Sequence, residues 1–260
     1  MKNVALITGA SGGIGMELAR IHAARGNDLV IVARSTNKLT RLKTELETQY
    51  TVEVMAISKD LGKREAPEEI YRELQQQEIQ VEYLINNAGF GDYGLFFETD
   101  WEKEEQMIDL NMKSLTHLTK LFLPDMIKRR SGRIMNVAST AAFQPGPLMA
   151  IYYATKHYVL AFSEAIANEV KDYGVTVTAL CPGPTASGFQ SAAAMEESKL
   201  VNSIKMPSSA EVADYGYQAM IKGKAVAIHG KANSMMAKTV GFLPRNLVTG
   251  LVRKLQEKKS

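Results

Sequence analysis

Seven short runs of β-branched and other apolar residues alternate with longer amphipathic segments along most of this chain. The runs cover 4–8, 29–33, 52–57, 81–86, 133–138, 175–180 and 225–228. Helical periodicity covers 13–25, 37–49, 67–77, 101–129, 152–173 and 209–222 between them. Strand, helix and strand in succession form the unit that builds a parallel sheet. The pattern therefore predicts an α/β fold, a doubly wound parallel sheet of seven strands with helices on both faces.

The domain organisation follows from the same pattern. No internal repeat, low-complexity tract or linker-like stretch interrupts it, so a single domain over 1–260 is expected. Hydrophobic residues at 45% and charged residues at 23% are typical of soluble globular proteins and can bury a sizeable core. The segment 182–206 is rich in Gly, Ala and Ser and has no clear period, which predicts a flexible substrate lid over about 184–206.

Cysteine and histidine usage bears on compartment and metals. Cys181 is the only cysteine, so no intramolecular disulfide can form, and the four histidines have no zinc-like spacing. The first apolar run ends at Thr8 and is too short for a secretory signal, while the long uncharged stretches are broken by Pro and Gly. We expect a cytoplasmic protein with no membrane span and no metal site.

Charge is concentrated in the C-terminal part of the chain. The formal net charge is +3, which gives no support for nucleic-acid binding. Residues 222–260 hold nine Lys or Arg and one acid, a charge of +8 that leaves −5 for the rest. A basic helical extension over about 231–260 is predicted, with an apolar stripe of Leu247, Val248, Leu251, Val252 and Leu255. Such a helix can contact an anionic membrane peripherally, although ordinary packing on the protein is the favoured reading.

A glycine-rich turn joins the first strand to the first helix. Glycines there let the backbone approach a pyrophosphate, and the helix N-terminus presents free N–H groups to it. The spacing differs from the usual G-x-G-x-x-G, and a turn that only packs strand on helix is the alternative. The residues expected to bind a dinucleotide here are Gly9, Ser11, Gly12, Gly13, Ile14 and Gly15.

The end of the second strand bears on the choice of cofactor. An acid there would bind the adenine ribose hydroxyl of NAD, but the chain has Ala33 followed by Arg34, Ser35 and, soon after, Lys38. Cations can instead neutralise a ribose 2′-phosphate. NADP(H) is therefore the predicted cofactor and NAD(H) the alternative, unless Arg34 is an ordinary solvated charge.

Three further motifs accompany the glycine turn. Asn86 to Gly89 ends the fourth strand, Ser139 follows the fifth, and Tyr152 to Lys156 opens the next helix. Together with Thr8 to Gly15, these motifs closely resemble those of the short-chain dehydrogenase/reductase family, in order and spacing from Lys2 to about Ile228. The basic extension loosely resembles tails of its ketoacyl-reductase-like and hydroxysteroid-dehydrogenase-like branch. The resemblance implies a Rossmann-type fold.

The chemistry of these residues can be argued separately. Tyr152 and Lys156 are one helical turn apart, so they share a face, and an ammonium beside a phenol should lower its pKa. Tyr152 is therefore the predicted general acid/base. Ser139, at the carboxyl edge of the sheet, can polarise the same carbonyl oxygen. No His/Asp pair or nucleophile elbow supports a serine hydrolase.

Other roles are implied only by the resemblance. Asn111 would extend a proton relay from Lys156, although without the resemblance it would be interpreted as a structural amide. The same resemblance adds the following cofactor contacts to those of the glycine turn: Asp60, Leu61, Asn87, Ala88, Gly89, Tyr152, Lys156, Pro182, Gly183 and Thr185.

The sequence says less about the substrate and the partners than about the cofactor. Loops at the strand ends carry mostly apolar side chains and no obvious clamp for a carboxylate or phosphate, which favours an apolar ketone or alcohol, unless these side chains only pack the lid. The expected substrate-site residues are Ser139, Tyr152, Phe90, Phe143 and Phe189, with Tyr93, Ala141 and Met149 nearby. The helix over 157–167 is apolar nearly all round. A homo-dimer or tetramer through the helices carrying Asn111 and Tyr152 is predicted.

The predicted function is that of an NADPH-dependent oxidoreductase acting on C=O and CH–OH groups. The alternatives are a catalytically silent NADP(H) sensor and a membrane-associated interaction protein on the same fold. The full set of Asn111, Ser139, Tyr152 and Lys156 favours catalysis, because a sensor needs the glycine turn but not a proton path.

Overall fold

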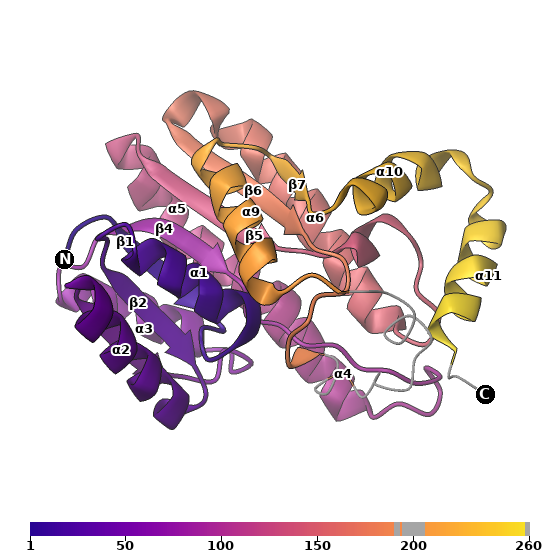
Figure 1. The fold of residues 1–260 in the computed structure, drawn as a ribbon, viewed down its shortest axis with the longest axis horizontal. Helices are drawn as coiled ribbons and strands as arrows, with labels where there is room; N and C mark the ends of the chain where they lie inside the picture. The colour runs from indigo at the N-terminus through magenta and orange to yellow at the C-terminus, as the bar shows by residue number, and fades with distance from the viewer. Residues whose placement is uncertain (190–192, 194–205, 258–260) are drawn as a thin grey trace.

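A single parallel sheet forms the centre of the molecule, in a computed structural model that describes residues 1–189, 193 and 206–257 (Figure 1). Its strands run in the order β3-β2-β1-β4-β5-β6-β7. The bounds are β1 Val4–Thr8, β2 Leu29–Ala33, β3 Val54–Ser58, β4 Val81–Asn86, β5 Gly132–Val137, β6 Val175–Cys181 and β7 Val226–Ile228. The predicted seven-stranded, doubly wound fold of one domain is confirmed, with strand ends displaced by at most two residues.

Helices cover both faces because successive strand residues point to opposite sides. In β1, Ala5 and Ile7 face one core cluster and Val4 and Leu6 face another. The first cluster is completed by α1 (Gly13–Ala23), α2 (Thr36–Tyr50) and α9 (Ser209–Ile221). The second is completed by α3 (Ala66–Gln76), α5 (Leu115–Arg129) and the C-terminal end of α6 (Ala150–Val170). Strands buried on both faces read as continuous apolar runs, which is why the sequence reveals them.

One predicted helix is interrupted. The segment expected as a continuous helix over 101–129 is α4 (Trp101–Ile108), a π-helical stretch η1 (Asp109–Ser114) and α5. A π-helical turn is rare and often marks a functional site. Here it contains Asn111, whose side chain is buried. Periodicity alone does not reveal such an insertion.

The C-terminal part lies beyond the carboxyl ends of the strands, on neither face of the sheet (Figure 1). It comprises α10 (Lys231–Thr239), the 3₁₀ turn η4 (Val240–Phe242) and α11 (Arg245–Gln256). Most of the lid expected over 184–206 lies outside the described residues, which include only 184–189, 193 and 206 of it. No helix in the described part of the chain is both long and apolar enough to cross a membrane.

Candidate active site

The glycine turn is held by close backbone contacts. Gly9 has φ +67°, and a Cβ there would lie 2.9 Å from the Cα of Ala88. At Gly15 a Cβ would lie 2.5 Å from the carbonyl oxygen of Gly9. Both distances are too short for a real side chain, so the turn requires glycine at these positions.

The N-terminus of α1 is open to an anion. Its N-cap is Gly12, no side chain caps the first N–H groups, and the first turn contains no acid. Unpaired N–H groups and the positive end of the helix dipole favour a phosphate at this position. Ser11, Gly12, Gly13 and Ile14 are all at least partly accessible, so the turn fits the pyrophosphate of a dinucleotide.

Thr8 ties the glycine turn to the end of β4. Its Oγ1 accepts hydrogen bonds from the backbone N–H groups of Asn87 (2.9 Å) and Ala88 (3.0 Å). The Asn87 side chain donates in return to the carbonyl oxygen of Thr8 at 2.9 Å. Thr8 is buried and was not among the predicted site residues. Its position at the end of β1 was the available signal, but its partners lie almost eighty residues away along the chain.

The residues expected at the adenosine end lie at adjacent strand ends. Arg34 and Lys38 are exposed, and Ser35 is the N-cap of α2, whose first turn has no acid. Asp60 is exposed and its carboxylate accepts from the N–H of Gly62 at 3.0 Å, while Leu61 is buried. The structure thus brings two exposed cations and an open helix N-terminus together, a combination that suits a phosphate.

The loop after β6 approaches Ser139. Ser139 Oγ lies 3.4 Å from the carbonyl oxygen of Pro182, and Thr185 Oγ1 donates to the carbonyl oxygen of Gly183 at 2.9 Å. Asn233 of α10 packs on Gly183, where a Cβ would lie 2.5 Å from its Nδ2. The predicted cofactor residues therefore lie at or just after the carboxyl ends of neighbouring parallel strands, or on the helix that carries Tyr152 and Lys156.

Tyr152, Ser139 and Lys156 lie together at the carboxyl edge of the sheet. Tyr152 and Ser139 share a side-chain hydrogen bond. The Nζ of Lys156 lies 5.7 Å from the centre of the Tyr152 ring and donates to the carbonyl oxygen of Val137 at 2.8 Å. The one-turn spacing does place both side chains on a common face, as predicted.

The pKa of the tyrosine differs from the expectation. Burial raises the pKa of Tyr152 to about 12, against a smaller lowering by the Ser139 hydrogen bond. Burial also lowers the pKa of Lys156 to about 8. The direction is opposite to the predicted lowering of the Tyr152 pKa, because desolvation is the largest effect on the buried phenol.

Asn111 is fixed by three hydrogen bonds. Its Oδ1 accepts from the N–H of Phe90 at 3.2 Å, and its Nδ2 donates to the carbonyl oxygen of Phe90 at 3.0 Å and to Thr155 Oγ1 at 3.1 Å. Gly89 lies against the amide on the side of Lys156, where a Cβ would be 2.9 Å from Oδ1 and 3.6 Å from Nζ. This position agrees with both roles considered for Asn111, a structural amide and an extension of the proton relay from Lys156.

An apolar cluster surrounds Tyr152. It combines Met107, Ala141, Met149 and the two tyrosines 152 and 153 with Phe90, Tyr93 and Phe189. The rings of Phe189 and Tyr152 are 5.2 Å apart. Phe143 is not part of the cluster, because it packs against a separate one that includes Leu115 and Val159. The structure thus brings together all the expected apolar residues except Phe143.

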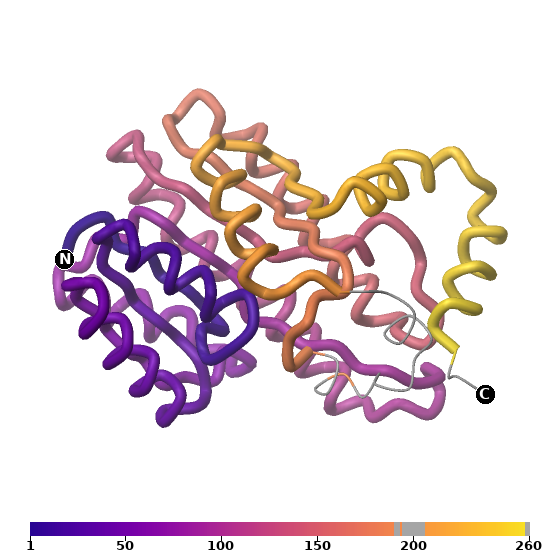
Figure 2. The backbone as a smooth tube through the Cα atoms, viewed as in Figure 1, coloured from indigo at the N-terminus to yellow at the C-terminus, as the bar shows by residue number. Residues whose placement is uncertain are grey.

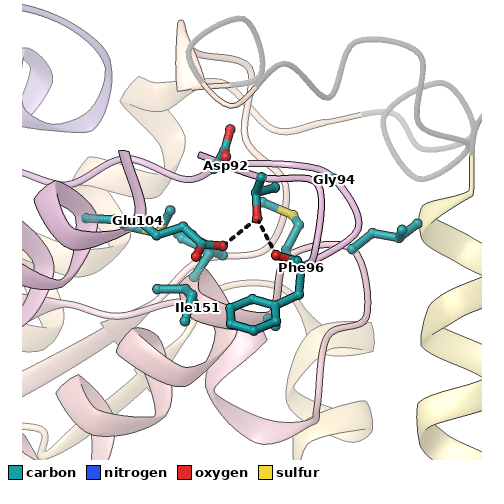
Figure 3. A pocket seen from close by; sticks show the side chains of 11 residues that line it. Asp92, Gly94, Phe96, Glu104 and Ile151 are labelled. Atoms are coloured by element: carbon teal, nitrogen blue, oxygen red, sulfur yellow. Dashed lines mark hydrogen bonds between the residues drawn. The ribbon is translucent and has the colours of Figure 1, made fainter. Parts of the chain in front are cut away.

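A narrow pocket lies beside this cluster (Figure 3). Asp92, Gly94, Phe96, Glu104 and Ile151 are among the residues that line it. The hydroxyl of Thr99 lies 2.7 Å from Glu104 Oε1 and 3.1 Å from the carbonyl oxygen of Phe96. These bonds brace the loop that precedes α4.

Helix α11 contributes residues that the sequence did not indicate. Val248 and Val252 belong to the apolar cluster, and the carbonyl oxygen of Gln256 accepts from Tyr93 Oη at 2.6 Å. The Gln256 side chain donates to Tyr153 Oη at 2.5 Å. The four-residue spacing of Val248, Val252 and Gln256 was the only signal available. No group of His, Cys, Asp and Glu within the described residues could hold a metal ion.

Comparison with known proteins gives the family. The short chain dehydrogenase family model matches residues 3–198. A very-long-chain 3-oxoacyl-CoA reductase of Anas platyrhynchos is 35% identical over 68% of this chain, and a hydroxysteroid dehydrogenase-like protein 1 of Gallus gallus is 31% identical over 83%. These matches span 58% and 65% of the two relatives, so the chain matches less than two thirds of their length.

Solved structures with a similar fold support the same family. A short-chain dehydrogenase from Sphingobium yanoikuyae, solved in complex with NADPH, is 30% identical, with a TM-score of 0.83 over 99% of this chain and 97% of that one. A bulky-bulky ketone specific alcohol dehydrogenase from Comamonas testosteroni is 26% identical, with a TM-score of 0.79 over 99% and 96%. The chain belongs to the short-chain dehydrogenase family, whose members are NAD(P)-dependent oxidoreductases, and the predicted resemblance is confirmed.

Proposed function

We propose that this protein is an NADPH-dependent oxidoreductase that interconverts the carbonyl and hydroxyl forms of a mostly apolar substrate. The observation that carries the proposal is the convergence of Tyr152, Ser139 and Lys156 between an open phosphate cradle and an apolar cluster. Neither a binding module nor a scaffold needs a buried phenol bonded to a serine beside a lysine.

In the reductive direction, Tyr152 is the proton donor. The glycine turn and the N-terminus of α2 would hold the nicotinamide cofactor, which would supply a hydride for the substrate carbon. The phenol gives its proton to the substrate oxygen, and the Ser139 hydroxyl orients that oxygen by a hydrogen bond. The pKa of about 12 keeps Tyr152 protonated at neutral pH, which is the form that reduction requires. Lys156 stabilises the phenolate that remains, and Asn111 holds the backbone at Phe90 beside it.

For the cofactor, Arg34 and Lys38 favour NADP(H). Both are exposed beside the N-terminus of α2, where a ribose 2′-phosphate would meet two cations and free N–H groups. The neighbour from Sphingobium yanoikuyae in complex with NADPH supports this choice.

For the substrate, the apolar cluster favours a ketone without a charged group beside the carbonyl. The relatives named as 3-oxoacyl-CoA reductases and the bulky-bulky ketone specific neighbour suggest 3-oxoacyl thioesters and bulky ketones for the first panel. Phe189, whose ring covers Tyr152, belongs to the proposed lid.

Assembly and location complete the proposal. Tyr158 and Phe162 stack 5.8 Å apart on the outer side of α6, next to an apolar recess lined by Met112, Thr116 and His117. A second subunit through these helices would cover that surface, giving a dimer or tetramer. The single, buried cysteine suits the reducing cytoplasm.

The experiment follows NADPH absorbance with the ketone panel. Tyr152→Phe should lose at least about a thousandfold in kcat/KM and still bind NADPH, because it lacks only the transferable proton. Tyr153→Phe is the matched control on the same helix and should keep most of the turnover, since that hydroxyl bonds Gln256 instead. Substantial turnover in Tyr152→Phe would contradict the mechanism, and NADPH binding with no turnover on any ketone would favour the sensor.

A further inference from the structure

Helix α11 has two apolar stripes, of which only one packs on the protein. Val248, Val252 and Gln256 are buried against the apolar cluster around Tyr152. Leu247, Leu251 and Leu255, each one position earlier, are 53%, 50% and 54% exposed. Residues four apart lie on one face of a helix, so these leucines form a continuous ridge that faces solvent.

The ridge continues into the preceding turn. Phe242 is 90% exposed, Leu243 is 45% exposed and Met235 of α10 is 69% exposed. Single exposed apolar residues are ordinary, but six along one short arm mark an interaction surface. We call these six residues the apolar ridge.

The charge around the ridge is strongly positive. From residue 231 to the end, the chain has seven Lys or Arg and one acid, Glu257, which pairs with Arg253 at 3.8 Å. The remainder of the chain is negatively charged overall. Lys238, Arg245 and Lys254 lie on the same two helices as the ridge.

We propose that the α10–α11 arm is a docking surface for an anionic lipid bilayer. Exposed leucine and phenylalanine beside lysine and arginine on one short arm are typical of segments that lie in a membrane interface. The cores of protein–protein interfaces are instead depleted in lysine, which argues against a second copy of this chain as the occupant. The buried stripe of α11 forms part of the Tyr152 cluster, so docking places the candidate active site next to the bilayer.

The first experiment is vesicle co-sedimentation of the full chain. Binding is expected to phosphatidylcholine vesicles that contain phosphatidylglycerol, to weaken with salt, and to be far lower on phosphatidylcholine alone. The triple variant Leu247→Gln, Leu251→Gln, Leu255→Gln should bind about a hundredfold more weakly, because half-exposed leucines lose their burial in lipid. Each of Lys238→Gln and Lys254→Gln should weaken binding about fivefold.

Matched controls replace exposed apolar residues elsewhere. Ile221→Gln in α9 and Tyr173→Ser in the 3₁₀ turn η3 (Lys171–Tyr173), at 39% and 46% exposure, should bind vesicles as the unchanged chain does. Wild-type binding by the triple leucine variant, equal loss in the controls, or no binding to anionic vesicles would each overturn the proposal.

A fluorescence reporter tests the contact directly. Trp101 is the only tryptophan, so Trp101→Phe combined with Leu251→Trp places a single indole on the ridge. Its emission should shift to the blue with anionic vesicles and be quenched by brominated lipid. A blue shift that grows with protein concentration in the absence of vesicles, together with a larger sedimenting species, would show that a second copy covers the ridge and would overturn the proposal.

Discussion

The charge of Lys156 depends on the burial of its side chain in the candidate active site. Because burial lowers its pKa to about 8, the ammonium that steadies the Tyr152 phenolate is lost just above neutral pH. The reductive kcat/KM should therefore fall as the pH rises through about 8. Lys156→Met should be much slower and should lack this step in the pH profile. A flat profile for the unchanged protein between pH 7 and about 9 would contradict the role given to Lys156.

His22 makes folding stability depend on pH far from the active site. It is fully buried between Tyr217 Oη and the carbonyl oxygen of Asn3, each 2.8 Å away, and burial lowers its pKa from 6.5 to about 4. The unfolded chain therefore binds a proton below pH 6.5 that the folded chain does not bind until about pH 4. The contribution of His22 to stability should fall as the pH drops through this interval, by about 3 kcal/mol in total, and should be constant above it.

The check for His22 is thermal unfolding at several pH values beside His22→Gln. Carboxylates titrate in both proteins, so the difference between the two isolates the histidine. The variant should be the less stable protein near pH 7, with the gap narrowing toward pH 4.5. A gap that stays constant would show that His22 does not titrate in this way.

Among the elements, the turn between β1 and α1 offers a matched pair of glycines. A Cβ at Gly15 would meet the Asn87 amide and the Gly9 carbonyl group, whereas a Cβ at Gly12 meets nothing within 4 Å and the backbone there is extended. Gly15→Ala should cost about 2 kcal/mol in the free energy of unfolding, and Gly12→Ala less than about 0.5 kcal/mol. Urea unfolding of both variants measures this, and equal losses would contradict the steric account.

The elements also show what could be predicted from the sequence. Strands buried on both faces leave continuous apolar runs in the sequence, so the fold can be predicted from it. The motifs at Gly9, Ser139, Tyr152 and Lys156 follow strand ends or helix starts, so the edge of the sheet at which the site lies can be predicted as well. The π-helical turn around Asn111 cannot be predicted in this way, because one inserted residue barely changes the periodicity of the apolar side chains.

Side-chain contacts between segments far apart in the chain could not be predicted from the sequence either. Gln256 and Tyr153 are 103 positions apart, and Phe143 could be placed near the substrate only by its loop. The pKa of Tyr152 depends on burial by the whole closed site, including Phe189, which no local pattern encodes.

At the scale of the whole molecule, the proposed assembly uses the outer side of α6. Ala161 and Ala165 are exposed there beside Tyr158 and Phe162, and small residues let two helices approach closely. Ala161→Arg should convert the proposed dimer or tetramer to monomers in analytical ultracentrifugation. Ala56→Arg, an exposed alanine on the edge strand β3, is the control and should leave the assembly intact. A monomeric unchanged protein would refute the oligomer itself.

The bond between Gln256 and Tyr153 has a practical consequence for handling this protein. It joins the last turn of α11 to the helix that carries Tyr152, so a bulky fusion attached just after that turn would crowd a contact with the catalytic helix. The N-terminus lies at the opposite end of the molecule (Figure 2). Fusions and surface immobilisation are therefore best made through Met1, so that binding and rate measurements report on an unstrained enzyme.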